Sequence, residues 1–304
     1  MPANLCGGVR ILTGKGFIPG EWKNKKRKGI LKMNIGQTIL LGTIQGLTEF
    51  LPISSSGHLV IFQKIIGLKN PEILLDISLH IGTLLAILIF FRGDIKAIIT
   101  EGLAFIRDVI SKKKTVSEIR RIPNAALILW ILIGTVPTGI IGIIFKPLFI
   151  HMFGSAFLVG AMLIVTGLIL GSSLFIPVSM KKNSEPGLIS ALLVGLMQGA
   201  AIMPGISRSG STIVCGLFCG LNREAAGRFS FLLSVPAIIG ASLLEFDISK
   251  ITKIGATPFI IGIGVSFIVG LFALKITMTL VRKGNLYYFA PYCLLAGIIT
   301  IIIT

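Results

Sequence analysis

Six long apolar runs dominate the sequence and restrict the folds that are open to it. They lie at about residues 73–91, 127–145, 155–176, 228–246, 258–275 and 287–304. Each is close to the ~20 residues that a helix needs to cross a bilayer. Only 13% of the residues are charged, whereas a soluble domain has about 25%. Because helices satisfy their own backbone hydrogen bonds in lipid, the sequence predicts an all-α polytopic membrane protein with six transmembrane helices.

Basic residues lie mostly between the apolar runs and give the chain a net charge of +17. The loop 92–122 alone holds eight Lys and Arg residues. Basic loops are typical of the cytoplasmic side of a membrane, so the charge indicates orientation rather than nucleic-acid binding. This loop is therefore predicted to be cytoplasmic, with an amphipathic helix near 94–111. The loops 146–154 and 247–257 are predicted to lie outside.

Residues 1–32 form a basic N-terminal tail with eight Lys and Arg residues and a single acid, Glu21. Tails of this composition are usually disordered. Counting the spans places the tail outside, where so many basic residues are unusual. Since Met33 follows at once, the interpretation that we favour is an upstream extension ahead of a native start at Met33.

Two polar breaks each separate a pair of shorter apolar segments. The first joins the predicted helices 36–51 and 57–68 and reads Glu49-Phe-Leu-Pro-Ile-Ser-Ser-Ser-Gly-His58. The second joins the helices 188–203 and 210–220 and reads Pro204-Gly-Ile-Ser-Arg208-Ser-Gly-Ser-Thr212. Each segment is shorter than a bilayer span. Each pair is therefore predicted to form a re-entrant helix-loop-helix hairpin.

The two breaks are related by an internal repeat. Matching residues lie 152 or 153 positions apart: Pro52 and Pro204, Gln45 and Gln198, Gly57 and Gly210. Duplicated halves of this kind are common in membrane proteins. Residues 33–304 are thus predicted to form a single membrane domain of two repeats, about 34–180 and 187–304. Each repeat has one hairpin and three spans, so the second is inverted and the hairpins meet near mid-membrane.

The residue types in the two breaks suit phosphoryl chemistry. Glu49 lies near the hydroxyls of residues 54–56 and the imidazole of His58, which together can supply nucleophilic attack with proton transfer. Arg208 offers a planar fork of donors for phosphate, and the Ser and Gly residues around it can leave helix-start N–H groups facing an anion. The two breaks together are predicted to form one site.

Structural interpretations remain open for the same residues. The Ser-rich and Gly-rich runs are also typical of close helix packing, and His58 alone is more often a hydrogen-bonded structural histidine. Arg208 and Glu49 could form a buried structural ion pair. For Asp76 and His80, at the start of a predicted span, we favour a capping role over a functional one.

The stretch from Gln45 to His58 resembles the first signature of the bacterial undecaprenyl-diphosphatase, or bacitracin-resistance, family, and the stretch from Pro204 to Thr212 resembles its second. The likeness runs from about residue 34 to the C-terminus. It implies an integral membrane phosphatase that removes the terminal phosphate of undecaprenyl diphosphate and so recycles the carrier lipid for cell-wall synthesis. The implied fold has six spans and two re-entrant hairpins, and the implied site opens to the outer face of the cytoplasmic membrane.

The resemblance also implies roles for individual residues. By position it makes Glu49 the essential carboxylate, Ser55 the candidate nucleophile, His58 the essential histidine and Arg208 the phosphate-binding arginine. The other polar side chains of the two motifs are expected to bind substrate: Gln45, Ser54, Ser56, Ser207, Ser209, Ser211 and Thr212. The nucleophile is left open between Ser55, His58 and water.

Further expectations concern ligands and partners. The resemblance implies stimulation by Mg²⁺ or Ca²⁺, with no site assigned and with Glu49 as one candidate ligand. The expected partners are a polyprenyl diphosphate lipid and the membrane, without nucleic acid, and a homodimer is left open. An alternative function is a transporter that flips a polyprenyl phosphate, because inverted repeats with hairpins that meet at mid-depth are a transporter architecture.

The predicted orientation can be tested by labelling in intact cells. A cysteine that replaces Lys113 should be protected from an impermeant thiol reagent, because loop 92–122 is expected in the cytoplasm. A cysteine that replaces Phe149, in the loop expected outside, should react. The reverse pattern would contradict the orientation.

Overall fold

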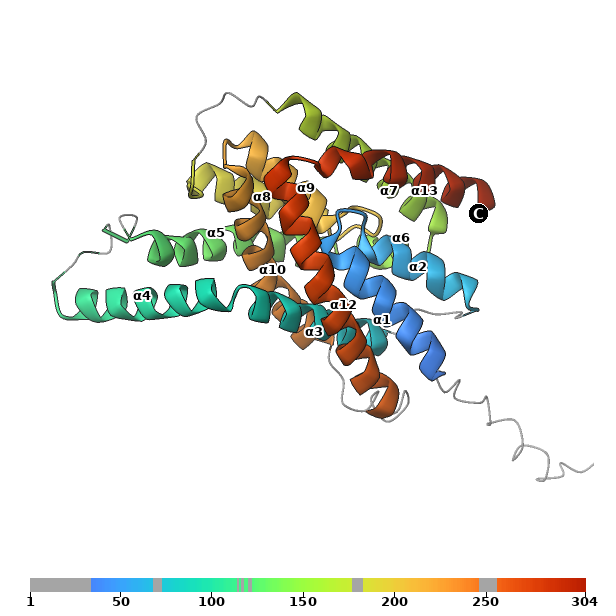
Figure 1. The fold of residues 1–304 in the computed structure, drawn as a ribbon, viewed down its shortest axis with the longest axis horizontal. Helices are drawn as coiled ribbons and strands as arrows, with labels where there is room; N and C mark the ends of the chain where they lie inside the picture. The colour runs from blue at the N-terminus through green and yellow to red at the C-terminus, as the bar shows by residue number, and fades with distance from the viewer. Residues whose placement is uncertain are drawn as a thin grey trace, which may run out of the picture. The chain divides into compact units, whose positions relative to one another are not determined.

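The structure is a computed structural model, and it describes residues 34–67, 73–113, 115, 118–119, 122–176, 183–245 and 256–304. These residues are mostly α-helical (Figure 1). Within these ranges no strand occurs, and the one β-type contact is an isolated bridge between Asn183 and Leu221. The predicted all-α polytopic class is confirmed. The basic tail 1–32 lies outside the described residues.

Long apolar helices form at all six predicted runs. Five in the described part of the chain are long and apolar enough to cross a membrane: α5 (Pro123–Ile144), α7 (Ala156–Ser172, continued by η3, Ser173–Phe175), α10 (Arg223–Glu245), α12 (Ala256–Lys283), and α13 (Ala290–Ile303), preceded by η4 (Leu286–Phe289). A sixth arises if α3 (Ile73–Phe90) and α4 (Arg92–Ile110) are one span that bends by 73°. The amphipathic helix expected near 94–111 is α4.

The segment 146–154, predicted as a loop, is mostly helical. It contains α6 (Lys146–Phe153), which has a proline in its first turn and buries Phe149 and Met152. Proline is favoured there because its fixed φ suits the start of a helix, and residues three positions apart share a helix face. Phe149 is therefore a poor position for thiol labelling. His151, exposed on the same helix, is the better choice.

Each polar break connects two short helices. The first pair is α1 (Ile35–Phe50) and α2 (Ser55–Ile65), and the second is α8 (Leu188–Ala200) and α9 (Arg208–Phe218). Ser54 and Ser207 are the N-caps of α2 and α9 and accept from the backbone N–H groups of Gly57 and Gly210, at 3.3 and 3.2 Å. The predicted starts at 57 and 210 were thus two residues late. That these pairs are re-entrant in a membrane stays a prediction.

Each half of the chain contributes one helix that packs against two helices of the other half. α12 packs against α1 and α3, while α5 packs against α8 and α10. α7 and α13, one from each half, pack against each other and run side by side in Figure 1. Small residues allow these approaches: a Cβ on Gly160 would lie 2.9 Å from the carbonyl oxygen of Gly297. Close contact through small residues is typical of helices in membranes.

The two breaks lie directly against each other. A Cβ on Gly57 would lie 3.1 Å from Cα of Gly205. Gly205 has φ +102°, a conformation that favours glycine. Thr166 on α7 stabilises this turn through two hydrogen bonds. Its hydroxyl donates to the Gly205 carbonyl at 2.8 Å and accepts from the Ser207 N–H at 3.0 Å. Helix starts that are distant in sequence are therefore held at one place.

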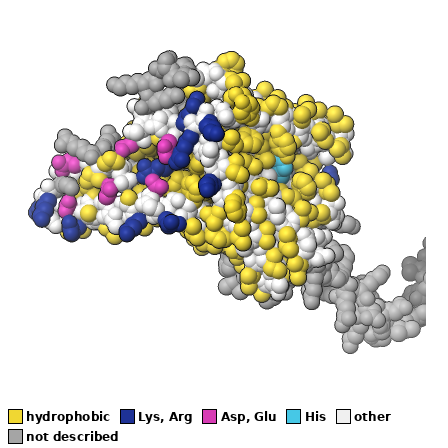
Figure 2. All heavy atoms as spheres, viewed as in Figure 1, with side chains coloured by type: hydrophobic (Ala, Val, Ile, Leu, Met, Phe, Trp, Pro, Cys, Tyr) yellow, Lys and Arg dark blue, Asp and Glu magenta, His cyan; other side chains and the backbone are white. Residues whose placement is uncertain are grey.

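Hydrophobic side chains cover much of the visible surface in Figure 2, whereas charged side chains gather toward the end formed by α4. On α5 the side chains of Leu132, Val136 and Ile143 are 59%, 59% and 72% exposed. Large apolar residues exposed along a whole helix are expected where lipid, rather than water, surrounds it.

The contact between α5 and α8 can be tested with one added methyl group. In Gly195→Ala the new Cβ would overlap the backbone of Gly134 on α5, and overpacking of this kind costs ~1–3 kcal/mol. Gly139→Ala is the matched control, because a Cβ at that position meets nothing within 4 Å. We expect a lower thermal unfolding midpoint in detergent for Gly195→Ala alone. Equal midpoints for the two variants would contradict the packing described.

Candidate active site

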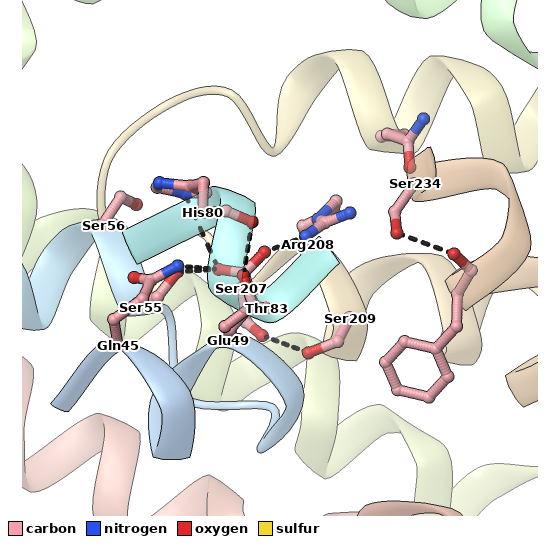
Figure 3. A network of polar contacts seen from close by, with 12 residues as sticks. Gln45, Glu49, Ser55, Ser56, His80, Thr83, Ser207, Arg208, Ser209 and Ser234 are labelled. Atoms are coloured by element: carbon pink, nitrogen blue, oxygen red, sulfur yellow. Dashed lines mark hydrogen bonds and ion pairs between the residues drawn. The ribbon is translucent and has the colours of Figure 1, made fainter. Parts of the chain in front are cut away.

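Glu49 lies at the centre of a polar cluster between the two breaks (Figure 3). It occupies the last turn of α1 and is only 5% exposed. Its Oε1 forms an ion pair with Nη2 of Arg208. Its Oε2 accepts from the hydroxyl of Ser55 at 2.5 Å and from the side-chain amide of Gln45 at 3.0 Å. A buried carboxylate needs such partners, because an unpaired charge away from water is very unfavourable.

Ser55 and Arg208 reach Glu49 from equivalent positions. Each is the first residue of an 11-residue helix, α2 or α9, and each follows a serine N-cap. They are 153 positions apart, which is the interval of the repeat. The N-terminal ends of both helices are therefore close to the carboxylate. A helix N-terminus carries free N–H groups and a partial positive charge, so this arrangement favours an anion.

His80 on α3 is the fourth side chain directed at this carboxylate. Its Nε2 is 3.8 Å from Oε2 of Glu49, and its Nδ1 is 2.7 Å from the backbone carbonyl of Asp76. The bond within α3 agrees with the structural role favoured from the sequence. The approach to Glu49 was not anticipated, because 31 positions separate the two residues and no local pattern relates them.

His58 lies on α2 one turn after Ser55, but its ring nitrogens are directed elsewhere. Nδ1 is 2.8 Å from the carbonyl of Ser54, and Nε2 is 2.7 Å from the hydroxyl of Tyr292 on α13. Among the described contacts, none joins His58 to Glu49. No motif in the sequence points to Tyr292, since it lies far from both breaks along the chain.

Several other hydroxyl groups of the motifs contact neighbouring residues. Ser54 and Ser207 cap their helices, and each is also 3.3 Å from the hydroxyl two residues later, on Ser56 or Ser209. Thr212 contacts the hydroxyl of Ser230 on α10 at 2.5 Å. Among the described contacts of the three adjacent serines 54–56, the hydroxyl that reaches Glu49 is that of Ser55.

Four buried polar atoms near the breaks have no hydrogen-bond partner among the described residues, and one of them is Oε1 of Gln198. The other three are Oε1 of Gln45, Nη1 of Arg208 and Oγ of Ser211. Buried polar groups are nearly always satisfied, so each unsatisfied one needs an explanation. One donor of Arg208 is occupied by Glu49 while another is free, as a site that binds an anionic ligand requires.

Comparisons with known proteins agree with the motifs. The family model for the bacitracin resistance protein BacA matches residues 38–299. A curated relative from Desulfatibacillum aliphaticivorans, named undecaprenyl-diphosphatase, is 46% identical over 267 residues, which cover 86% of this chain and 95% of the relative. Relatives of the same name from Desulforapulum autotrophicum and Halothermothrix orenii are 42% and 45% identical, and each alignment covers 89% of this chain and 98% of the relative.

Proposed function

Because the chain belongs to the BacA bacitracin-resistance family, we propose that the cluster around Glu49 is where it hydrolyses undecaprenyl diphosphate to undecaprenyl phosphate and inorganic phosphate. The reaction is that of a membrane phosphatase, and it returns the carrier lipid to cell-wall synthesis. The family and the names of the relatives do not favour the alternative of a transporter.

The observation that carries the site assignment is the convergence of donors on one buried anion. Arg208 and Ser55 approach the Glu49 carboxylate from the starts of two helices. A phosphate group presents the same kind of oxygens, and arginine binds it through the same planar fork. We therefore propose that the diphosphate takes over the donors of Arg208 and of the helix starts, which frees Glu49 to act as a base.

The hydrogen bond between Ser55 and Glu49 suggests the attacking group. The Ser55 hydroxyl donates to Oε2 of Glu49 at 2.5 Å, as activation by an adjacent base requires. In the proposed step the Ser55 oxygen bonds to the terminal phosphorus, Glu49 takes the hydroxyl proton, and the anhydride bond breaks to release undecaprenyl phosphate. Water then attacks the phosphoserine, releases inorganic phosphate and restores the serine. Arg208 stabilises charge on the phosphoryl oxygens.

The expected divalent cation fits these residues in part. No group of three or more His, Cys, Asp and Glu suited to a metal ion occurs in the described ranges. Mg²⁺ and Ca²⁺ prefer oxygen ligands and often complete their shells with substrate phosphates and water. We propose that the Glu49 carboxylate and the unsatisfied Oε1 of Gln45 hold the cation together with the diphosphate, where it would neutralise phosphate charge.

The apolar helices make this a membrane protein. From the basic loops we propose the orientation of the spans. From the family we propose that the protein lies in the cytoplasmic membrane with the site open to the outer face. The labelling at Lys113 and at His151 tests this orientation.

Phosphate release from undecaprenyl diphosphate in detergent micelles tests the function and the site together, since micelles have no two sides to transport between. We expect wild-type release that EDTA lowers. Arg208→Lys, which loses the fork, and Glu49→Gln, which loses the base, should each reduce turnover by about 10³-fold at unchanged yield.

The matched controls are Arg282→Lys and Glu224→Gln, because these residues form an ion pair of the same kind that is more than half exposed, with a distance of 2.8 Å. Both controls should keep wild-type turnover. No wild-type release with any divalent cation would overturn the function. Normal release by Glu49→Gln would overturn the site alone.

The nucleophile can be tested at Ser55. Ser55→Ala should lose nearly all turnover, and substrate labelled in its terminal phosphate should leave label on the wild-type protein but not on this variant. Ser56→Ala should keep far more activity, because its hydroxyl contacts Ser54 rather than Glu49. Near-normal turnover by Ser55→Ala would instead make water the attacking group.

A further inference from the structure

The hydrogen bonds of His58 define which of its nitrogens carries a proton. Nδ1 lies 2.8 Å from the carbonyl oxygen of Ser54. A carbonyl can only accept, so Nδ1 carries hydrogen. In the neutral ring Nε2 is then an acceptor, and the Tyr292 hydroxyl, 2.7 Å away, donates to it. If the ring gains a second proton, Nε2 donates to the same oxygen, because a phenol can do either.

Tyr292 belongs to the last helix of the chain, is 46% exposed, and contacts the first break. Its ring is parallel to that of His58 within 9°, with centroids 5.8 Å apart. The next residue, Cys293, is fully buried, and its Sγ is 3.8 Å from the carbonyl oxygen of Pro52. Two consecutive residues of α13 therefore contact the break that carries Ser55 and His58.

We propose that Tyr292 is a positioning residue for the hydrolysis, and that its hydroxyl fixes the tautomer and direction of the His58 ring. The inference rests on the site proposed around Glu49 and Ser55, because His58 lies one helical turn after Ser55 on α2 and its ring is part of the same break. Metal-bound and catalytic histidines are oriented in the same way by the hydrogen bond at their other nitrogen. With Nδ1 on Ser54 and Nε2 on Tyr292, His58 has no free nitrogen for attack on phosphorus.

The connection also explains why α13 takes part in a site built from the two breaks. Its partner α7 holds the second break through Thr166, and α13 holds the first through Tyr292 and Cys293. The pair of helices thus contacts both breaks, and each helix contacts the break that belongs to the other half of the repeat. A hydroxyl on α13 can set the geometry of a histidine 234 positions earlier in the chain.

Tyr292→Phe removes the hydroxyl and keeps the ring. We expect a fall of about tenfold in kcat with little change in KM, since positioned acid–base groups contribute 10²–10⁴-fold and the variant weakens one of them rather than removing it. The control is Tyr288→Phe, because Tyr288 is 62% exposed and contacts another tyrosine, Tyr287. This control should keep wild-type kcat.

A double-mutant cycle separates positioning from general packing. If Tyr292 acts through His58, its loss should lower kcat in the wild type but have almost no effect in a His58→Gln background. A merely structural role would lower kcat by the same factor in both backgrounds. Equal factors would overturn the proposal.

Nitrogen-15 spectra of the histidine rings give a readout that does not depend on activity. The chain has three histidines, so His58→Gln identifies the His58 signals. We expect the Nδ1–H tautomer in the wild type and a shifted Nε2 signal in Tyr292→Phe, with no shift in Tyr288→Phe. An Nε2–H tautomer in the wild type would overturn the proposal. A normal kcat for His58→Gln would also overturn the proposal, whereas the proposed function itself would fail only if the wild type released no phosphate.

Discussion

A largely buried ion pair joins the two polar breaks, between Glu49 at the end of α1 and Arg208 at the start of α9. The two residues are 159 positions apart. Removing either charge from water is strongly unfavourable, and only close partners in fixed positions compensate for it. The surrounding fold must therefore bring two distant chain breaks together and hold each at a defined angle. Several contacts in the fold hold the two breaks in these positions.

Hydrogen bonds and close backbone contacts fix these breaks in ways that apolar packing alone does not. Serine N-caps end each break at the same point, and glycine at position 205 allows the two to touch. Thr166 on α7 and Cys293 on α13 then bond to backbone groups of the breaks. In an apolar surrounding each unsatisfied backbone group would be costly, so these bonds both stabilise the breaks and define the site.

If the proposed site is correct, the same arrangement connects stability with catalysis. Donors that neutralise Glu49 in the free protein are the ones that a diphosphate would use. Substrate binding can therefore exchange one anion for another without building new structure, while a cation would compensate the additional negative charge. Preorganised donors of this kind are an effective way to stabilise the charge that develops in phosphoryl transfer.

The sequence alone determined the class of fold, the positions of the membrane helices and the residues of the two motifs. These follow from apolar run length and from local residue types, which are properties of neighbouring positions. It could not place His80 beside Glu49 or Tyr292 on His58. The resemblance singled out Ser55 among three adjacent serines, but the residues alone did not show that this hydroxyl is the one that reaches Glu49. It also predicted α6 as a loop. Contacts between distant segments, and the direction in which a helix start points a side chain, are decided only when the helices pack against one another.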